Sequence, residues 1–175
     1  LCGPDVAVTD VALVADDFDA RFSATARRYR YRVLNRPAPD PFRSRYAWHV
    51  DEELSWPALV LACDALIGEH DFSAFCRRPK RRDGEEASLV RRVVSAEWER
   101  AGDDELRFEI EASSFCHQMV RSVVGLLVDV GRGRRHAGEV LGIIRSGDRS
   151  RTGNLAPPQG LTLWTVRYPG WDSGP

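Results

Sequence analysis

Arginines alternate with aromatic and aliphatic residues along residues 28–33, with a period of two. Successive side chains of a β-strand point to opposite faces, so this period predicts a strand. One face of the strand is predicted to carry guanidinium groups, and the other to carry aromatic and aliphatic side chains. The two faces consist of Arg28, Arg30 and Arg32 and of Tyr29, Tyr31 and Val33.

A β-hairpin is predicted in the second half of the chain. Residues 89–100 and 105–112 are rich in strand-forming residues, and a turn at residues 102–104 separates them. Along the second strand, apolar residues alternate with charged ones, which is typical of a half-buried antiparallel strand. The alternation places Glu109 and Glu111 on the wet face, and a reading of them as a catalytic pair of a glycosidase is therefore disfavoured.

Three helices are predicted from apolar residues that recur every three or four positions. Residues 58–67 follow Ser55, a residue type that can cap a helix. Residues 115–130 carry the broadest apolar stripe, and residues 136–146 form a shorter third helix.

Further strands are predicted at residues 46–50 and 161–168, and residues 6–14 are predicted to be a strand or a strand-like linker. This order of elements predicts an α+β fold, a mainly antiparallel sheet with helices packed on one face. The length of 175 residues predicts a single domain. Within it we expect residues 1–15 to be an interdomain linker or first strand and residues 169–175 to be a tail.

The composition is that of an ordinary globular protein. No apolar run approaches the length of a membrane span, and no secretory signal precedes the first strand. The four cysteines show neither a C-x-x-C pair nor metal-ligand spacing with the four histidines. We therefore expect free thiols and no metal site.

The formal net charge of −1 argues at first against a nucleic-acid partner. Arginines are nevertheless clustered, six of them within residues 21–36 and further ones at residues 77–82 and 91–92, while acids gather elsewhere. A neutral total is therefore compatible with a basic face.

Two interpretations of residues 28–33 remain open at this point. The arginines could be solvated on the outside of a sheet while the tyrosines fill the core. Alternatively, guanidinium groups bind phosphate oxygens and a tyrosine ring stacks on a nucleobase, which is the chemistry of RNA recognition.

The helix at residues 115–130 poses a similar question, because Arg121 lies beside its buried face. An arginine in that position needs an anionic partner. The partner is either a local acid, such as Asp129 or Glu111, or a group in a catalytic cleft. The basic segment at residues 77–87 is likewise either a solvated loop or an arm that grips phosphate groups.

Four stretches occur in a specific order, namely DDFDARFSATARRYRYRVLNR (residues 16–36), HDFSAF (70–75), FCHQMVRSVVG (115–125) and GLTL (160–163). In order and approximate spacing they resemble the TruA family of tRNA pseudouridine synthases. The resemblance runs from about residue 5 to residue 168. It implies the pseudouridine synthase fold, an isomerase that acts on tRNA without a cofactor, and a homodimer in the cytoplasm.

The resemblance also implies roles for individual residues. Tyr29 corresponds to the active-site tyrosine that contacts the base, and Leu161 to an apolar residue of the pocket. Arg121 corresponds to the arginine that pairs with the catalytic aspartate.

The expected tRNA-contacting segment is residues 18–22, and we add arginines from charge placement and from the basic loop. The candidate RNA-binding residues are Phe18, Arg21, Phe22, Arg27, Arg28, Arg43, Arg45, Arg78, Lys80 and Arg81.

The family's catalytic aspartate belongs to a GRTDAGVH motif, and this string does not occur in the sequence. We therefore expect the chain to be the C-terminal half of a tRNA pseudouridine synthase that modifies the anticodon stem-loop, with the N-terminal half as its partner. It would supply the pocket wall and RNA-binding surface but not the nucleophile. Two other readings are a non-catalytic RNA-binding module derived from the family and a dimerisation or scaffold domain.

Overall fold

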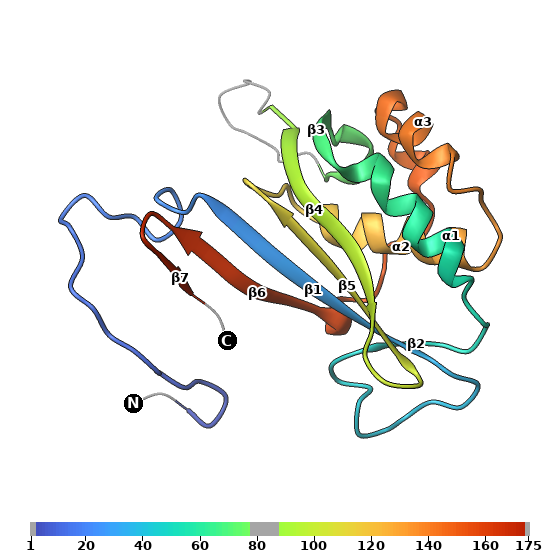
Figure 1. Cartoon of the computed structure of the whole chain (residues 1–175), viewed down its shortest axis with the longest axis horizontal. Helices are drawn as coiled ribbons and strands as arrows, with labels where there is room; N and C mark the ends of the chain where they lie inside the picture. The colour runs from blue at the N-terminus through green and yellow to red at the C-terminus, as the bar shows by residue number, and fades with distance from the viewer. Residues whose placement is uncertain (1–2, 78–87, 174–175) are drawn as a thin grey trace.

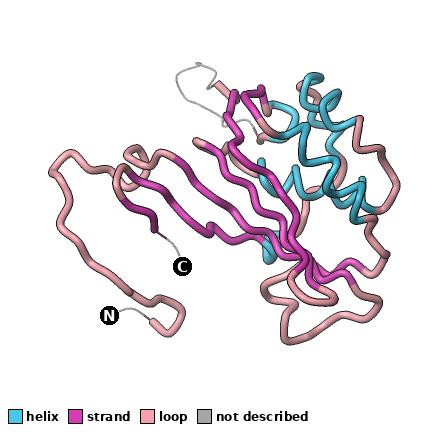
Figure 2. Tube along the Cα trace, in the orientation of Figure 1, coloured by secondary structure: helices cyan, strands magenta, loops and turns pink. Residues whose placement is uncertain are grey.

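The computed structural model describes residues 3–77 and 88–173. One twisted sheet forms a layer, and the helices pack against one of its faces (Figures 1 and 2). The prediction of an α+β fold with a mainly antiparallel sheet is confirmed. None of the described helices combines the length and the apolar character needed to cross a bilayer.

The sheet has seven strands among the described residues, in the order β3-β4-β5-β1-β6-β7, with β2 also paired to β1. All pairings are antiparallel except the parallel pair of β1 and β2. The strands are β1 (Ala26–Asn35), β2 (Trp48–Val50), β3 (Gly68–Asp71), β4 (Val90–Arg100), β5 (Glu105–Ala112), β6 (Leu161–Tyr168) and β7 (Trp171–Ser173).

Strand β1 lies at the centre of this order and has the predicted alternation. Tyr31 and Val33 are fully buried on the side of the helices, while Arg28, Arg30 and Arg32 lie on the other face. Neighbouring strands cover both edges of β1, with β5 along one edge and β6 followed by β2 along the other.

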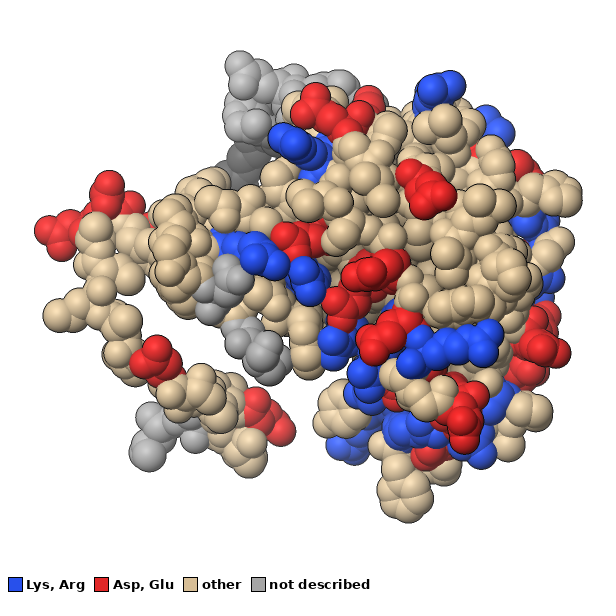
Figure 3. All heavy atoms as spheres, in the orientation of Figure 1, with Lys and Arg blue, Asp and Glu red and all other residues tan. Residues whose placement is uncertain are grey.

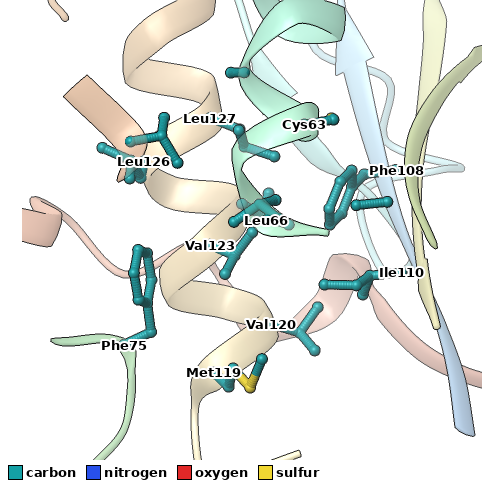
Figure 4. Packing of buried hydrophobic residues seen from close by; sticks show 14 of the residues in the cluster. Cys63, Leu66, Phe75, Phe108, Ile110, Met119, Val120, Val123, Leu126 and Leu127 are labelled. Carbon is teal, nitrogen blue, oxygen red and sulfur yellow. The ribbon is translucent and has the colours of Figure 1, made fainter. Parts of the chain in front are cut away.

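The predicted helices form, although each is shorter than its apolar pattern. They are α1 (Trp56–Cys63), α2 (Met119–Gly131) and α3 (Glu139–Ser146), and short 3₁₀ turns follow or link them at η1 (Asp64–Leu66), η2 (Ser73–Phe75), η3 (Arg149–Thr152) and η4 (Pro158–Gly160). Helix α2 is buried almost all round, and its apolar side chains meet those of α1 and β5 in one core (Figure 4). The two phenylalanines of the HDFSAF motif are buried in the same core.

The two ends of the chain differ in part from the prediction. Of the two alternatives for residues 6–14, the strand does not form; these residues are irregular and exposed, and they lead away from the body of the fold (Figure 1). Part of the expected tail is strand β7, which pairs with β6. Gly170 has a left-handed φ of 88°, and this turn lets Trp171 stack on Tyr168 at 4.6 Å between ring centroids.

The prediction that Glu109 and Glu111 are solvated is wrong. Both lie on the face of the sheet opposite the helices, as predicted, but arginines cover them there. Both are largely buried, with relative exposures of 9% and 7%. Arg30 lies 2.5 Å from Glu109, and Arg28 lies 2.7 Å from Glu111, because these residues are directly opposite in register. The period of two identified the face correctly, but the long arginine stems on the neighbouring strand cover the carboxylates.

The same pairing extends toward the other end of β1. Arg32 and Arg107 both hydrogen-bond Glu105; burial alone would raise the pKa of this carboxyl, and the two guanidinium groups bring it below its ordinary value. Arg43 likewise lowers the pKa of Asp104 through a side-chain hydrogen bond. On the face seen in Figure 3, basic and acidic atoms accordingly interleave over this region instead of forming one basic patch.

The expectation of free thiols is wrong for two cysteines. Cys76, directly after η2, and Cys116, just before α2, form a disulfide with Cα atoms 5.6 Å apart. Cys63 is free and buried, and burial raises the pKa of its thiol to about 12. The separation of 40 residues gives no local spacing signal, so the pair was not visible in the sequence.

Reduction of this disulfide is expected to lower the free energy of unfolding by roughly 3–4 kcal/mol, because it frees a long loop in the unfolded chain. The measurement is chemical denaturation with and without dithiothreitol, together with the intact mass of the unreduced protein. A Cys76→Ser/Cys116→Ser double variant should lose the sensitivity to reductant. An unchanged denaturation midpoint for the unmodified chain would contradict the prediction.

Candidate active site

A cleft of about 430 Å³ opens where β1 and β6 meet the start of α2. Its lining includes Tyr29 and Leu161, the two residues predicted to contact the base, and Arg121, the residue predicted to pair with the catalytic aspartate. The motifs YRYRVL, FCHQMVR and GLTL, which are far apart in the sequence, therefore contribute to one site. Phe115 and Pro158 complete its apolar part.

Tyr29 and Leu161 are positioned by the sheet. Tyr29 lies on β1 and pairs with β6, and its ring meets the edge of Phe115 with centroids 5.0 Å apart. Leu161 begins β6 directly after Gly160. A Cβ at Gly160 would lie 2.7 Å from the Tyr31 ring, so glycine is needed for β6 to start this close to β1.

Arg121 lies in the first turn of α2, and its side chain is held by a backbone carbonyl. Its Nε donates to the Ala156 carbonyl at 2.6 Å, and the Ala156 amide donates to the Arg121 carbonyl at 3.1 Å. Among residues 3–77 and 88–173, no carboxylate lies within 4.0 Å of its guanidinium, and no acceptor is bound to its two terminal nitrogens. The guanidinium therefore lines the cleft with most of its hydrogen-bonding capacity free.

The local salt bridge considered for Arg121 is not formed. Asp129 lies beside Arg132 and Arg134, and Glu111 is paired with Arg28 and Arg167. The two acids named as alternatives are thus engaged with other arginines, and neither is the partner of Arg121.

The segment at residues 153–160 brings Pro158 to the cleft and is anchored at several points. The buried Tyr31 hydroxyl donates to the Pro157 carbonyl at 2.6 Å, and burial raises the pKa of this phenol. A Cβ at Gly125 would lie 1.9 Å from the Asn154 carbonyl oxygen, so the segment crosses α2 in direct backbone contact. Arg121 is therefore part of a fixed wall.

The candidate RNA-contacting residues near the start of β1 form a group of their own. The Phe18 ring lies 5.1 Å from that of Tyr168, while Phe22 is exposed, with the Arg21 guanidinium 5.5 Å from its ring centroid. Arg27 is less available, because its guanidinium donates to three backbone carbonyls, those of Ala24, Ser113 and Arg21.

The remaining candidates do not join that group. Arg28 is engaged by Glu111 on the face opposite the helices. Arg43 and Arg45 lie in the loop after β1, at the other end of the strand from Tyr29, and Arg43 is bound by Asp40 and Asp104. The predicted positions Arg78, Lys80 and Arg81 lie outside the described residues.

Some cleft residues were not predicted. Phe115 and Gln118 belong to the FCHQMVR stretch, which was recognised, but only Arg121 was assigned a role. Gln118 has a left-handed φ of 69° at the start of α2, which is uncommon for a non-glycine residue. Among the described residues no group of three or more His, Cys, Asp and Glu side chains could hold a metal ion.

A family model described as tRNA pseudouridine synthase matches residues 62–169. The chain belongs to the tRNA pseudouridine synthase family, as its motifs predicted.

Relatives named "tRNA pseudouridine synthase A" match nearly the whole chain. The protein from Myxococcus xanthus is 42% identical over 168 residues, covering 96% of this chain and 62% of the relative. The one from Methylobacterium nodulans is 43% identical over 164 residues, covering 94% of this chain and 63% of the relative. The chain thus spans less than two thirds of the length of these relatives.

Proposed function

We propose that this chain supplies the base pocket and part of the RNA surface of a tRNA pseudouridine synthase, which isomerises uridine to pseudouridine in the anticodon stem-loop. The observation that carries the proposal is the meeting of Tyr29, Leu161 and Arg121 in one cleft. Arg121 has no carboxylate partner among the described residues, as expected if an aspartate from another part of the enzyme occupies that position.

The reaction breaks the bond from ribose C1′ to uracil N1 and forms the bond from C1′ to C5; C5 then loses its proton and N1 gains one, so the product is an isomer of the substrate. The uridine must first leave its stack, and a cleft with an aromatic wall receives such an extruded base. Tyr29 offers a ring supported at its side by Phe115, and Leu161 excludes water beside it. Arg121 then keeps the incoming aspartate ionised and oriented, so it acts as a positioning residue.

The proposal includes three partners. They are tRNA, the aspartate-bearing N-terminal half of the enzyme, and a second copy in a homodimer, all in the cytoplasm. Each rests on the family relationship. We call this chain together with the aspartate-bearing half the complete enzyme.

A second candidate function is a non-catalytic RNA-binding module. It is favoured by the same observation, since none of the described acids lies at the Arg121 guanidinium. In that case the cleft would hold a base without changing it.

The purified 175-residue chain is expected to show no pseudouridine formation, because no acid of the cleft replaces the family's aspartate. The measurement is tritium release from a stem-loop whose uridines are labelled at C5. Adding a polypeptide with the GRTDAGVH motif, taken from a relative, should give turnover. Turnover by the chain alone would refute the claim that the nucleophile lies in another part of the enzyme. RNA binding without turnover in the mixture would favour the non-catalytic RNA-binding module.

A further inference from the structure

A second cavity, of about 530 Å³, lies next to the cleft and contains none of the residues assigned to the proposed reaction. It is lined by Ser73, Cys76, Arg77, Gln118, Gly147 and Arg149. Gln118 lines the cleft as well, so the two cavities share one wall at the start of α2.

The charges of this cavity are unbalanced. Arg77 and Arg149 both line it, and no carboxylate of the described residues lies within 4.0 Å of either guanidinium. Arg149 instead donates to the Gln118 Oε1 at 2.6 Å, which orients its guanidinium along the wall shared with the cleft. The arginines of β1 differ, since Arg28, Arg30 and Arg32 each have an acid on β5.

The walls of the cavity come from separate segments that are fixed to one another. The Arg77 amide donates to the His117 carbonyl at 3.0 Å, and the Cys76–Cys116 disulfide links the same two segments. On the other side, a Cβ at Gly147 would lie 3.0 Å from the Ser73 Oγ, so the segment before η3 packs closely on η2. The segments that carry Arg77 and Arg149 are thus fixed relative to the rest of the cavity wall.

We propose that this cavity binds the backbone phosphodiester adjacent to the uridine held in the cleft. Two guanidinium groups without an acid favour an anion, and their planar donors match phosphate oxygens bidentately. A nucleotide whose base enters the cleft carries a phosphate on each side of its ribose, and a cavity that shares the Gln118 wall with the cleft is placed to receive one of them. This inference rests on the proposed function. It adds to that function a phosphate site that positions the RNA backbone so that the target uridine lies at the cleft.

The test measures binding of an anticodon stem-loop to the chain, comparing Arg149→Gln with Arg151→Gln. Arg151 is exposed on the same 3₁₀ turn and does not line the cavity, which makes it a matched control. Arg149→Gln is expected to weaken binding about 3- to 10-fold and to reduce the slope of log affinity against log salt by about one. Arg151→Gln should change affinity less than about twofold.

A second arm scans the stem-loop with a single uncharged methylphosphonate linkage at each successive position. At one position, the neutral linkage should weaken binding to the unmodified chain and have little further effect on Arg149→Gln, because both changes remove the same contact. Arg77→Gln should behave in the same way as Arg149→Gln. Thermal unfolding of all variants checks that they are folded.

The proposal is overturned if Arg149→Gln matches Arg151→Gln, or if the losses from the variant and from every neutral linkage simply add. Failure of the proposed function looks different, because the complete enzyme with unmodified arginines would then form no pseudouridine. Turnover by that enzyme with unaltered binding by Arg149→Gln would refute the phosphate site alone.

Discussion

Arg121→Ala in the complete enzyme is expected to lower kcat by about 10²- to 10³-fold, the effect of removing one preorganised charged group from an active site. Affinity for tRNA should fall by less than about tenfold, because the guanidinium acts on a carboxylate and not on the RNA backbone. The measurement is single-turnover pseudouridine formation together with a separate tRNA titration.

The control for this variant is Arg145→Ala, an exposed arginine on α3 that does not line the cleft. It should leave both kcat and affinity close to those of the unmodified enzyme. Thermal unfolding of Arg121→Ala is needed as well, because the side chain also bonds the Ala156 carbonyl. Equal losses of rate and affinity would instead mark Arg121 as a phosphate contact.

Gly125→Ala is expected to lower the free energy of unfolding by about 2–3 kcal/mol, as overpacking in a rigid core does. The added Cβ would lie 1.9 Å from the Asn154 carbonyl oxygen, and backbone at that distance has to move. For a domain of this size the melting temperature should fall by roughly 5–10 °C. Because residues 153–160 border the cleft, RNA binding should weaken too.

Gly142→Ala provides the matched control for that experiment. Gly142 lies within α3, and no heavy atom comes within 4 Å of a Cβ placed there. Alanine in an open helical position should raise stability by about 0.5–1 kcal/mol. Differential scanning calorimetry of both variants measures these changes in stability. A Gly125→Ala protein as stable as the unmodified chain would contradict the close contact with Asn154.

Local pattern was sufficient for the main elements, whereas the residues of the cleft came from the family resemblance. The alternation along β1 placed Tyr31 on the buried side, and the order of strands and helices indicated the α+β fold. The recognised motifs named Tyr29, Arg121 and Leu161, and the fold brings all three into one cleft. Periodicity alone did not bring them together, because nothing in a period of two or 3.6 links distant segments.

The errors share a physical cause, which is contact between distant segments. Periodicity assigned Glu109 to a face but not its cover, which comes from β1. The Cys76–Cys116 pair and the cavity of Arg149 depend on how the segments around η2 meet α2 and η3. Strand β7 is different, because the Pro169–Gly170 turn signal was present in the sequence and was overlooked.

The acids opposite the arginines of β1 also constrain how the sheet assembles. A slip of β1 by one residue against β5 would turn Arg28, Arg30 and Arg32 toward the hydrophobic interior. A slip of two would keep the faces, but in one direction it would place Arg28 opposite Ser113, and in the other it would place Arg30 opposite Arg107. The complementary charges of β1 and β5 therefore favour the native register of the two strands. They also mean that the number of arginines in one strand overstates a protein's attraction for polyanions unless the acids of the neighbouring strand are counted as well.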